Sequence, residues 1–126
     1  MIAVLIYAHK NKEQVQRLIN ALKNENVDIY VHADKNFSVD KFKAGILIKN
    51  RCAIKWGDPS IINSIVSSLK EIRKNKVYDY YILLSGQDYP VVSMNEIVKF
   101  LKDNKGKVII EFKKIGNGEN EWNVSN

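Results

Sequence analysis

The segment Ser85-Gly86-Gln87-Asp88-Tyr89-Pro90 carries the densest group of residues able to bind a polar ligand. It follows an apolar run from Tyr78 to Leu84, so a buried strand would deliver it to the edge of a sheet. A glycine lets a ligand approach the backbone closely, and the Gln87 amide and the Asp88 carboxylate can orient ligand hydroxyl groups. The alternative is a tight connection whose turn is set by its proline.

Asp34 and Trp56 are the residues best suited to contact a nucleotide. Asp34 follows the apolar run Val27–Ala33, and its carboxylate can accept hydrogen bonds from a ribose or a base edge. The equally weighted alternative is a turn in which the aspartate bonds its own backbone. Trp56 precedes Gly57-Asp58-Pro59, where its indole can stack on a base or anchor the following helix.

Residue content excludes several other kinds of site. His9 and His32 are the only histidines and Cys52 is the only cysteine, which rules out a histidine-rich metal site and an internal disulfide. Each histidine is more often structural than catalytic. The chain has no G-x-G-x-x-G fingerprint, P-loop, nucleophile elbow or zinc-binding spacing. Arginine occurs only at positions 17, 51 and 73, and none is expected at the carboxyl end of a strand.

The elements that would position these residues follow from the apolar pattern. Strands are predicted at residues 2–8, 27–33, 45–49, 78–84 and 108–110. Helices are predicted at residues 12–24, 39–44 and 58–75, and after residue 93. Three capping signals support helix starts: Asn11 with Gln14, Asp58-Pro59, and Ser93 with Glu96. The helix after Pro59 is expected to bury an apolar face made of Ile61, Ile62, Ile65, Val66, Leu69 and Ile72.

This alternation predicts an α/β fold with a mostly parallel sheet, flanking helices and right-handed crossovers. Ligands of such sheets bind outside the carboxyl ends of the strands. The site should therefore gather residues from four places: Ala8-His9, Ala33-Asp34, Lys55-Trp56 and Ser85–Asp88.

Length and charge narrow the class of protein. A chain of 126 residues predicts one domain, and its net charge of +6 comes mostly from lysine. Because arginine binds phosphates and base edges better than lysine does, nucleic-acid binding is not expected. A basic face that contacts an anionic membrane surface or receives a phosphorylated substrate is at least as plausible as nucleic-acid binding. The leading apolar run is too short for a secretory signal or a membrane span. With one cysteine, a cytoplasmic location or one at the inner face of the membrane is expected.

Four blocks of the sequence carry a resemblance to a known family. They occur in order as Tyr7–Gln14, Tyr30–Lys35, Trp56-Gly57 ahead of a helix, and Tyr78–Pro90. Together they resemble the core-2/I-branching glycosyltransferase family, which includes β-1,6-N-acetylglucosaminyltransferases and peptide xylosyltransferases, and the bacterial branch is the most similar in style. The resemblance extends from residue 2 to about residue 112. It implies a GT-A-like, Rossmann-like fold, a UDP-sugar donor and inverting transfer to a hydroxyl acceptor, carbohydrate or other.

The resemblance also implies roles for individual residues. Seven would contact the donor: Ala8, His9, Asp34, Trp56, Gly86, Gln87 and Asp88. Ala8 and His9 would border the uridine, Asp34 would bond the uracil or ribose side, and residues 86–88 would line the floor under the donor sugar. Glu111 matches a family glutamate on the acceptor side.

Two features set limits on what this chain supplies. Many GT-A enzymes hold a metal with an Asp-x-Asp pair where this chain has Gly86-Gln87-Asp88, and the family is similar in lacking that pair. No metal or other cofactor is therefore expected. The family's basic groups for the diphosphate and its general base lie in the C-terminal part, whereas this chain ends at Asn126. We expect a donor-binding domain at 1–112 and a polar tail at 113–126 that leads to a missing catalytic and acceptor half.

Three hypotheses follow for the function. The first is an inverting glycosyltransferase, or its donor-binding portion, acting on a sugar such as N-acetylglucosamine or xylose. In that case Asp88 and Glu111 are the catalytic candidates within the chain, neither of them certain. The alternative is a module that binds UDP or a UDP-sugar without turnover. The third and least favoured hypothesis is a basic protein that binds nucleic acid or an anionic surface.

Overall fold

The computed structural model describes residues 1–38, 42–53 and 58–109. Their elements follow in the order β1 (Ile2–Ala8), α1 (Lys12–Ala21), β2 (Val27–Ala33), β3 (Ile46–Leu47), α2 (Ser60–Asn75), β4 (Tyr80–Ser85) and α3 (Met94–Asp103). The strands form one sheet in the order β3-β2-β1-β4, and every pairing is parallel. The predicted α/β fold with a parallel sheet is confirmed.

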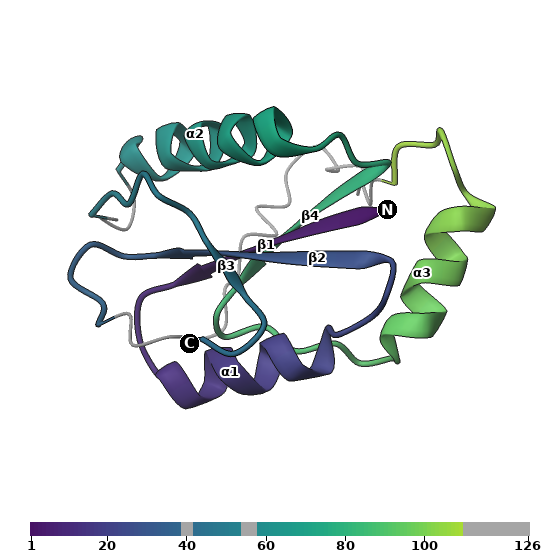
Figure 1. Ribbon diagram of the computed structural model, residues 1–126, viewed down its shortest axis with the longest axis horizontal. Helices are drawn as coiled ribbons and strands as arrows, with labels where there is room; N and C mark the ends of the chain where they lie inside the picture. Colours follow the sequence, from purple (N-terminus) through teal and green to yellow (C-terminus); the bar gives the residue numbers. More distant parts are fainter. Residues whose placement is uncertain (39–41, 54–57, 110–126) are drawn as a thin grey trace, which may run out of the picture.

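Helices cover both faces of this sheet (Figure 1). Strand β1 lies in the middle, and its successive side chains point to opposite faces. Ile2, Val4, Ile6 and Ala8 join the core that also contains buried residues of α1 and α3, whereas Ala3 and Leu5 pack with Ile72 of α2. Because both faces are covered, the strand needs apolar side chains at nearly every position. This accounts for the continuous apolar run at the start of the sequence.

Local capping fixes two of the helices as predicted. The Asn11 side chain accepts a hydrogen bond from the Gln14 N–H at 3.1 Å and begins α1. Before α3, Ser93 and Glu96 form a complete capping box. The α2 helix begins at Ser60, whose N–H donates to Asp58 Oδ1 at 2.7 Å, one residue later than the predicted start at Pro59. The capping signals therefore located the helix starts to within one residue.

Several predicted element boundaries were wrong. Helix α1 ends at Ala21 instead of residue 24, β3 has two residues instead of five, and β4 begins two residues after Tyr78. Residues 42–44 are not helical, and 39–41 lie outside the described residues. Val108 and Ile109 belong to no strand and are exposed; Ile110 is outside the described residues. A short apolar run does not itself specify a strand, because a strand also requires a ladder partner.

The buried face of α2 also differs from the prediction. Ser64, Ser68 and Ile72 are its buried residues, whereas Ile62 is 65% exposed and Val66 is 44% exposed. The reason lies on the sheet, where Tyr7 presents a hydroxyl to this helix. That hydroxyl is 2.9 Å from Ser64 Oγ and 3.3 Å from Ser68 Oγ. A buried polar group needs a hydrogen-bond partner. Helix α2 therefore turns Ser64 and Ser68 toward the sheet, and Ile62 and Val66, which the apolar pattern had placed on the buried face, are exposed.

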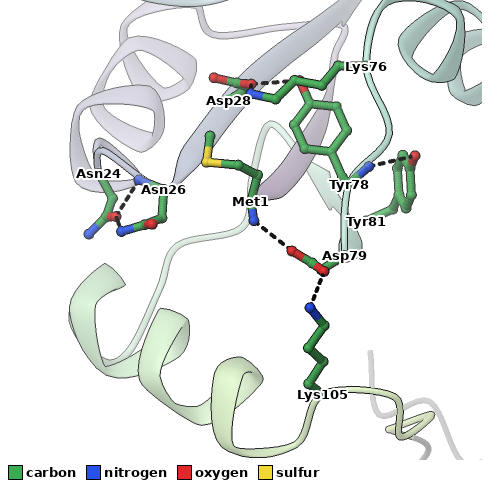
Figure 2. Close-up of polar contacts among 9 residues, drawn as sticks. All are labelled: Met1, Asn24, Asn26, Asp28, Lys76, Tyr78, Asp79, Tyr81 and Lys105. Atoms are coloured by element: carbon green, nitrogen blue, oxygen red, sulfur yellow. Dashed lines mark hydrogen bonds and ion pairs between the residues drawn. The ribbon is translucent and has the colours of Figure 1, made fainter.

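Polar contacts close the amino edge of the sheet, as Figure 2 shows. The Tyr78 hydroxyl donates to Asp28 Oδ2 at 2.6 Å, and the Lys76 ammonium lies 2.9 Å from the same oxygen. These hydrogen bonds, led by the one from Tyr78, lower the pKa of Asp28. Asp79 bridges the Met1 amino group at 2.7 Å and Lys105 at 2.9 Å, and its pKa falls to about 2. Asp28 and Asp79 are therefore both paired with cations at this edge.

Candidate functional site

A cavity of about 540 Å³ opens at the carboxyl edge of the sheet, where β1 and β4 end beside the start of α2. Its lining combines residues from three elements and the loops after two strands: Tyr7, His9, Lys10, Ile61, Ile65, Leu83, Leu84, Ser85 and Gln87. Parallel α/β sheets bind ligands at this edge. The volume also falls within the range of roughly 300–1,000 Å³ typical of small-molecule sites. This cavity is the candidate site.

The cavity has apolar walls and a polar mouth. Ile61 and Ile65 of α2 face Leu83 of β4, which is 49% exposed because β4 is the edge strand among the described residues. Tyr7 and Ser85 bring hydroxyl groups that are hydrogen-bonded within the fold. The other polar residues of the lining are His9, Lys10 and Gln87. Among the described residues the side chains of these three make no hydrogen bond or ion pair, and they are exposed. Polar groups left free around an apolar cavity are those a ligand can engage.

Three of the lining residues, His9, Ser85 and Gln87, belong to places where the sequence analysis expected the site. His9 and Gln87 follow different strands and line the same cavity, as the rule for carboxyl strand ends predicts. Tyr7, Lys10, Ile61, Ile65 and Leu83 were not singled out beforehand. For Lys10 a signal was present, since it follows His9 immediately. For the α2 and β4 residues no signal was present, because their apolar spacing is also that of core residues.

Asp88 closes the turn after β4 instead of lining the cavity. Its Oδ2 accepts the Ser85 N–H at 2.6 Å, and its own N–H donates to the Ser85 carbonyl at 3.1 Å. The Gln87 N–H donates to Ser85 Oγ at 3.0 Å, which leaves the Gln87 side chain directed to the cavity. A tight connection is therefore present, although contacts between Ser85 and Asp88 close it and the alternative had assigned the turn to Pro90. A ligand contact for Asp88 stays a prediction.

Gly86 is required by packing between β4 and α1. It is buried, and its N–H donates to the Tyr7 carbonyl at 2.7 Å. A Cβ at this position would lie 2.9 Å from Val15 Cγ2 and 3.2 Å from the Tyr7 carbonyl oxygen. Both distances are shorter than a carbon atom tolerates without movement of a neighbour. Close packing is thus a sufficient reason for glycine here, and its contact with a ligand stays a prediction.

Asp34 and Ala8 connect the ends of β1 and β2. The Asp34 N–H donates to the Ala8 carbonyl at 2.7 Å, and Asp34 Oδ1 accepts the Asn36 N–H at 2.8 Å. Asp34 is 7% exposed and Ala8 is fully buried. The turn-forming alternative for Asp34 is therefore present in the structure. The predicted contacts of both residues with a nucleotide are not tested by this geometry.

Arg51 corrects the expectation that no arginine lies at the carboxyl end of a strand. Its Nε donates to the Ala33 carbonyl at 3.0 Å, and its Nη2 donates to the carbonyls of Asp34 at 2.6 Å and Phe37 at 2.7 Å. The guanidinium thus fixes the loop after β2. No local pattern revealed this, because Arg51 comes 17 residues after Asp34 and reaches back through the fold.

An aromatic pair supports the floor of the cavity. The rings of Tyr7 and His32 stack with centroids 4.7 Å apart and planes 18° apart. His32 is fully buried, and its Nε2 accepts the Cys52 N–H at 3.2 Å. Burial lowers the pKa of His32 and raises the pKa of Tyr7, so both are neutral at pH 7. This arrangement gives His32 a structural place under the site.

Two of the predicted site residues, Trp56 and Glu111, lie outside the described residues, as does Lys55. Within residues 1–38, 42–53 and 58–109 no group of three or more His, Cys, Asp or Glu side chains is placed to hold a metal ion. No helix in that part of the chain is long and apolar enough to span a membrane. A second hollow of about 510 Å³ lies around Lys23–Ile29 at the amino edge of the sheet, away from the candidate site.

Comparison with known proteins gives a consistent assignment. Residues 2–125 match the family model of the Core-2/I-Branching enzyme. The chain is 30% identical over 122 residues to the mouse beta-1,3-galactosyl-O-glycosyl-glycoprotein beta-1,6-N-acetylglucosaminyltransferase 4, covering 87% of this chain and 27% of that protein. It is 28% identical over 108 residues to xylosyltransferase oxt of Drosophila pseudoobscura pseudoobscura, covering 78% of this chain and 12% of that protein. With human xylosyltransferase 1 it shares 25% identity over 109 residues, 78% of this chain and 11% of the relative.

Proposed function

Because the chain belongs to the Core-2/I-Branching enzyme family of glycosyltransferases, we propose that it binds a UDP-sugar donor in the cavity at the carboxyl edge. The donor sugar would be of the N-acetylglucosamine or xylose type, and the reaction would be inverting transfer to a hydroxyl group. The relatives with those printed activities support this choice. The chain spans only 12% and 27% of the length of these two relatives, so the activity of the whole protein is part of the proposal.

The observation that carries the proposal is the set of unpartnered polar side chains that line the cavity beside its apolar residues. His9 and Gln87 can hydrogen-bond a ligand there without breaking any contact within the described residues. The apolar lining residues favour a ligand that is partly planar and partly apolar. A nucleoside joined to a sugar by a diphosphate has that combination of groups.

Further residues would complete the donor site by their similarity to the family pattern. Ala8 and Asp34 would border the uridine, and Trp56 would stack on the base. Gly86 and Asp88 would shape the floor below the donor sugar. The turn at Asp34 supports this role indirectly, because Arg51 and the Ala8 carbonyl hold the Asp34 backbone rigidly at the strand end.

The catalytic step would draw on groups beyond this cavity. Transfer needs a base within about 3 Å of the acceptor hydroxyl and groups that stabilise the departing diphosphate. Glu111 would lie on the acceptor side. The Asp88 carboxylate accepts the Ser85 N–H at 2.6 Å, which makes it better placed to shape the donor site than to deprotonate an acceptor. We further propose that donor binding does not require a divalent metal.

A titration with UDP tests the proposed function. Chemical-shift mapping by NMR, without magnesium, should show shifts at His9, Ser85 and Gln87, with a dissociation constant on the order of 0.1–1 mM. Gln87→Ala should weaken binding, whereas Gln14→Ala on α1, which does not line the cavity, should not. Shifts confined to the lysine-rich outer faces of the helices, or to the amino edge near Asp28, would contradict the proposal.

A further inference from the structure

The mouth of the cavity carries an unbalanced positive charge. Lys10 is the one lysine or arginine among the described residues that line it, and no described lining residue is an aspartate or glutamate. Lys10 is exposed, and its ammonium makes no ion pair within the described part of the chain. A cation of this kind beside a cavity attracts an anionic ligand.

The backbone after Lys10 fixes where this charge lies. Asn11 adopts a left-handed conformation, with φ 53°, which few residues other than glycine and asparagine tolerate. Its side chain accepts the Gln14 N–H at 3.1 Å, and its carbonyl accepts the Val15 N–H at 3.2 Å. The chain therefore turns sharply from β1 into α1 at a fixed place. Lys10 immediately precedes that turn, and it lines the cavity.

The residues around Lys10 favour an interaction between its ammonium and an anion. Ile61, Ile65 and Leu83 give the cavity apolar walls, and such walls screen an ionic interaction less than bulk water does. Lysine binds phosphate as a compact point charge with three donors and needs no fixed bidentate geometry. A flexible lysine at the mouth can therefore contact a phosphate group while the rest of the ligand occupies the cavity.

We propose that Lys10 binds the diphosphate of the sugar nucleotide. It would act in addition to the basic groups that the family resemblance places in the C-terminal part of the protein. The inference rests on the proposed function for the nucleoside and sugar. The attraction between Lys10 and a phosphate group is a separate claim that can be tested alone.

The test compares UDP, uridine and inorganic pyrophosphate on the 126-residue protein and its variants, by calorimetry or NMR without magnesium. Lys10→Met should weaken UDP about tenfold, equivalent to about 1.4 kcal/mol, and leave uridine unchanged. It should also abolish the pyrophosphate-induced shifts at residues 9–11. UDP binding to the unaltered protein should weaken between about 50 and 300 mM salt, and binding to Lys10→Met should be much less salt-sensitive.

Lys35→Met is the matched control, because Lys35 is exposed at the carboxyl end of β2 but does not line the cavity. It should leave all three affinities unchanged. Equal losses of UDP affinity in Lys10→Met and Lys35→Met would overturn the inference by showing a general charge effect. A third variant, Lys55→Met, would overturn it if that variant alone weakened UDP binding. Failure of UDP and uridine to bind would defeat the proposed function. The Lys10 assignment would then stand if pyrophosphate still bound at Lys10 and would fall if it did not.

Discussion

The polar side chains that cluster around Asp28 and Asp79 at the amino edge differ from those that line the cavity at the carboxyl edge. At the amino edge, Asp28, Lys76 and Tyr78 bind one another, and Asp79 pairs with the Met1 amino group and Lys105. At the carboxyl edge, the side chains of His9, Lys10 and Gln87 line a cavity and have no partner among the described residues. Polar groups that are satisfied within the fold stabilise it, whereas polar groups left free at a cavity are available to a ligand.

The largest effect is expected from Gly86→Ala, which tests whether packing at the carboxyl edge stabilises the fold. Gly86→Ala would place a Cβ 2.9 Å from Val15 Cγ2 and 3.2 Å from the Tyr7 carbonyl oxygen, so β4 or α1 must shift. We expect a loss of about 1–3 kcal/mol of stability, measured by urea unfolding. Val15→Ala should be destabilising alone, yet it should recover part of the loss in the double variant. An unaltered unfolding midpoint for Gly86→Ala would contradict the packing account.

A smaller effect is expected at the amino edge. Asp28→Ala removes the acceptor for the Tyr78 hydroxyl and the partner of Lys76, which should cost about 1–2 kcal/mol. The pKa of Asp28 is lowered by folding, so its contribution is present above the unfolded pKa of about 4 and is lost as the pH falls below that value. The variant should therefore lose less stability than the unaltered protein between about pH 5 and pH 3.

The control for this variant is Asp103→Ala, since Asp103 is exposed and its side chain makes no hydrogen bond or ion pair within the described residues. It should change neither stability nor its pH dependence. The comparison of edges also requires that folded Asp28→Ala keep its UDP affinity. A variant that folds normally but no longer binds UDP would show that the amino edge takes part in binding.

Local signals in the sequence predicted most of this fold. The run at residues 2–8 and the capping residues Asn11 and Ser93 depend on neighbours a few positions away, and they gave β1, α1 and α3. The strand predicted at 45–49 is present only at Ile46–Leu47, and Val108 and Ile109 of the strand predicted at 108–110 are in no strand. Both strands would depend on partners distant in sequence. The prediction of the buried face of α2 was wrong for a related reason. Its serines hydrogen-bond with the Tyr7 hydroxyl, which is 57 and 61 residues away in the sequence.

The position of the cavity could be predicted from the sequence better than the contacts around it could. The rule for parallel sheets placed His9 and Gln87 together without any knowledge of side-chain positions. It could not show that Arg51 reaches the end of β2 or that Asp88 turns back to Ser85, because both depend on loop geometry. It also could not separate Leu83, which lines the cavity, from core residues of the same type.

Photolabelling with an azido-uridine diphosphate probe tests most directly which edge of the sheet binds the donor. After irradiation and digestion, mass spectrometry would locate the label on the protein. The account predicts labelled peptides from the carboxyl edge, around residues 7–10, 58–65 or 83–88, with protection by excess UDP. UDP-protected labelling concentrated at residues 23–29 or 76–81, at the amino edge, would contradict it.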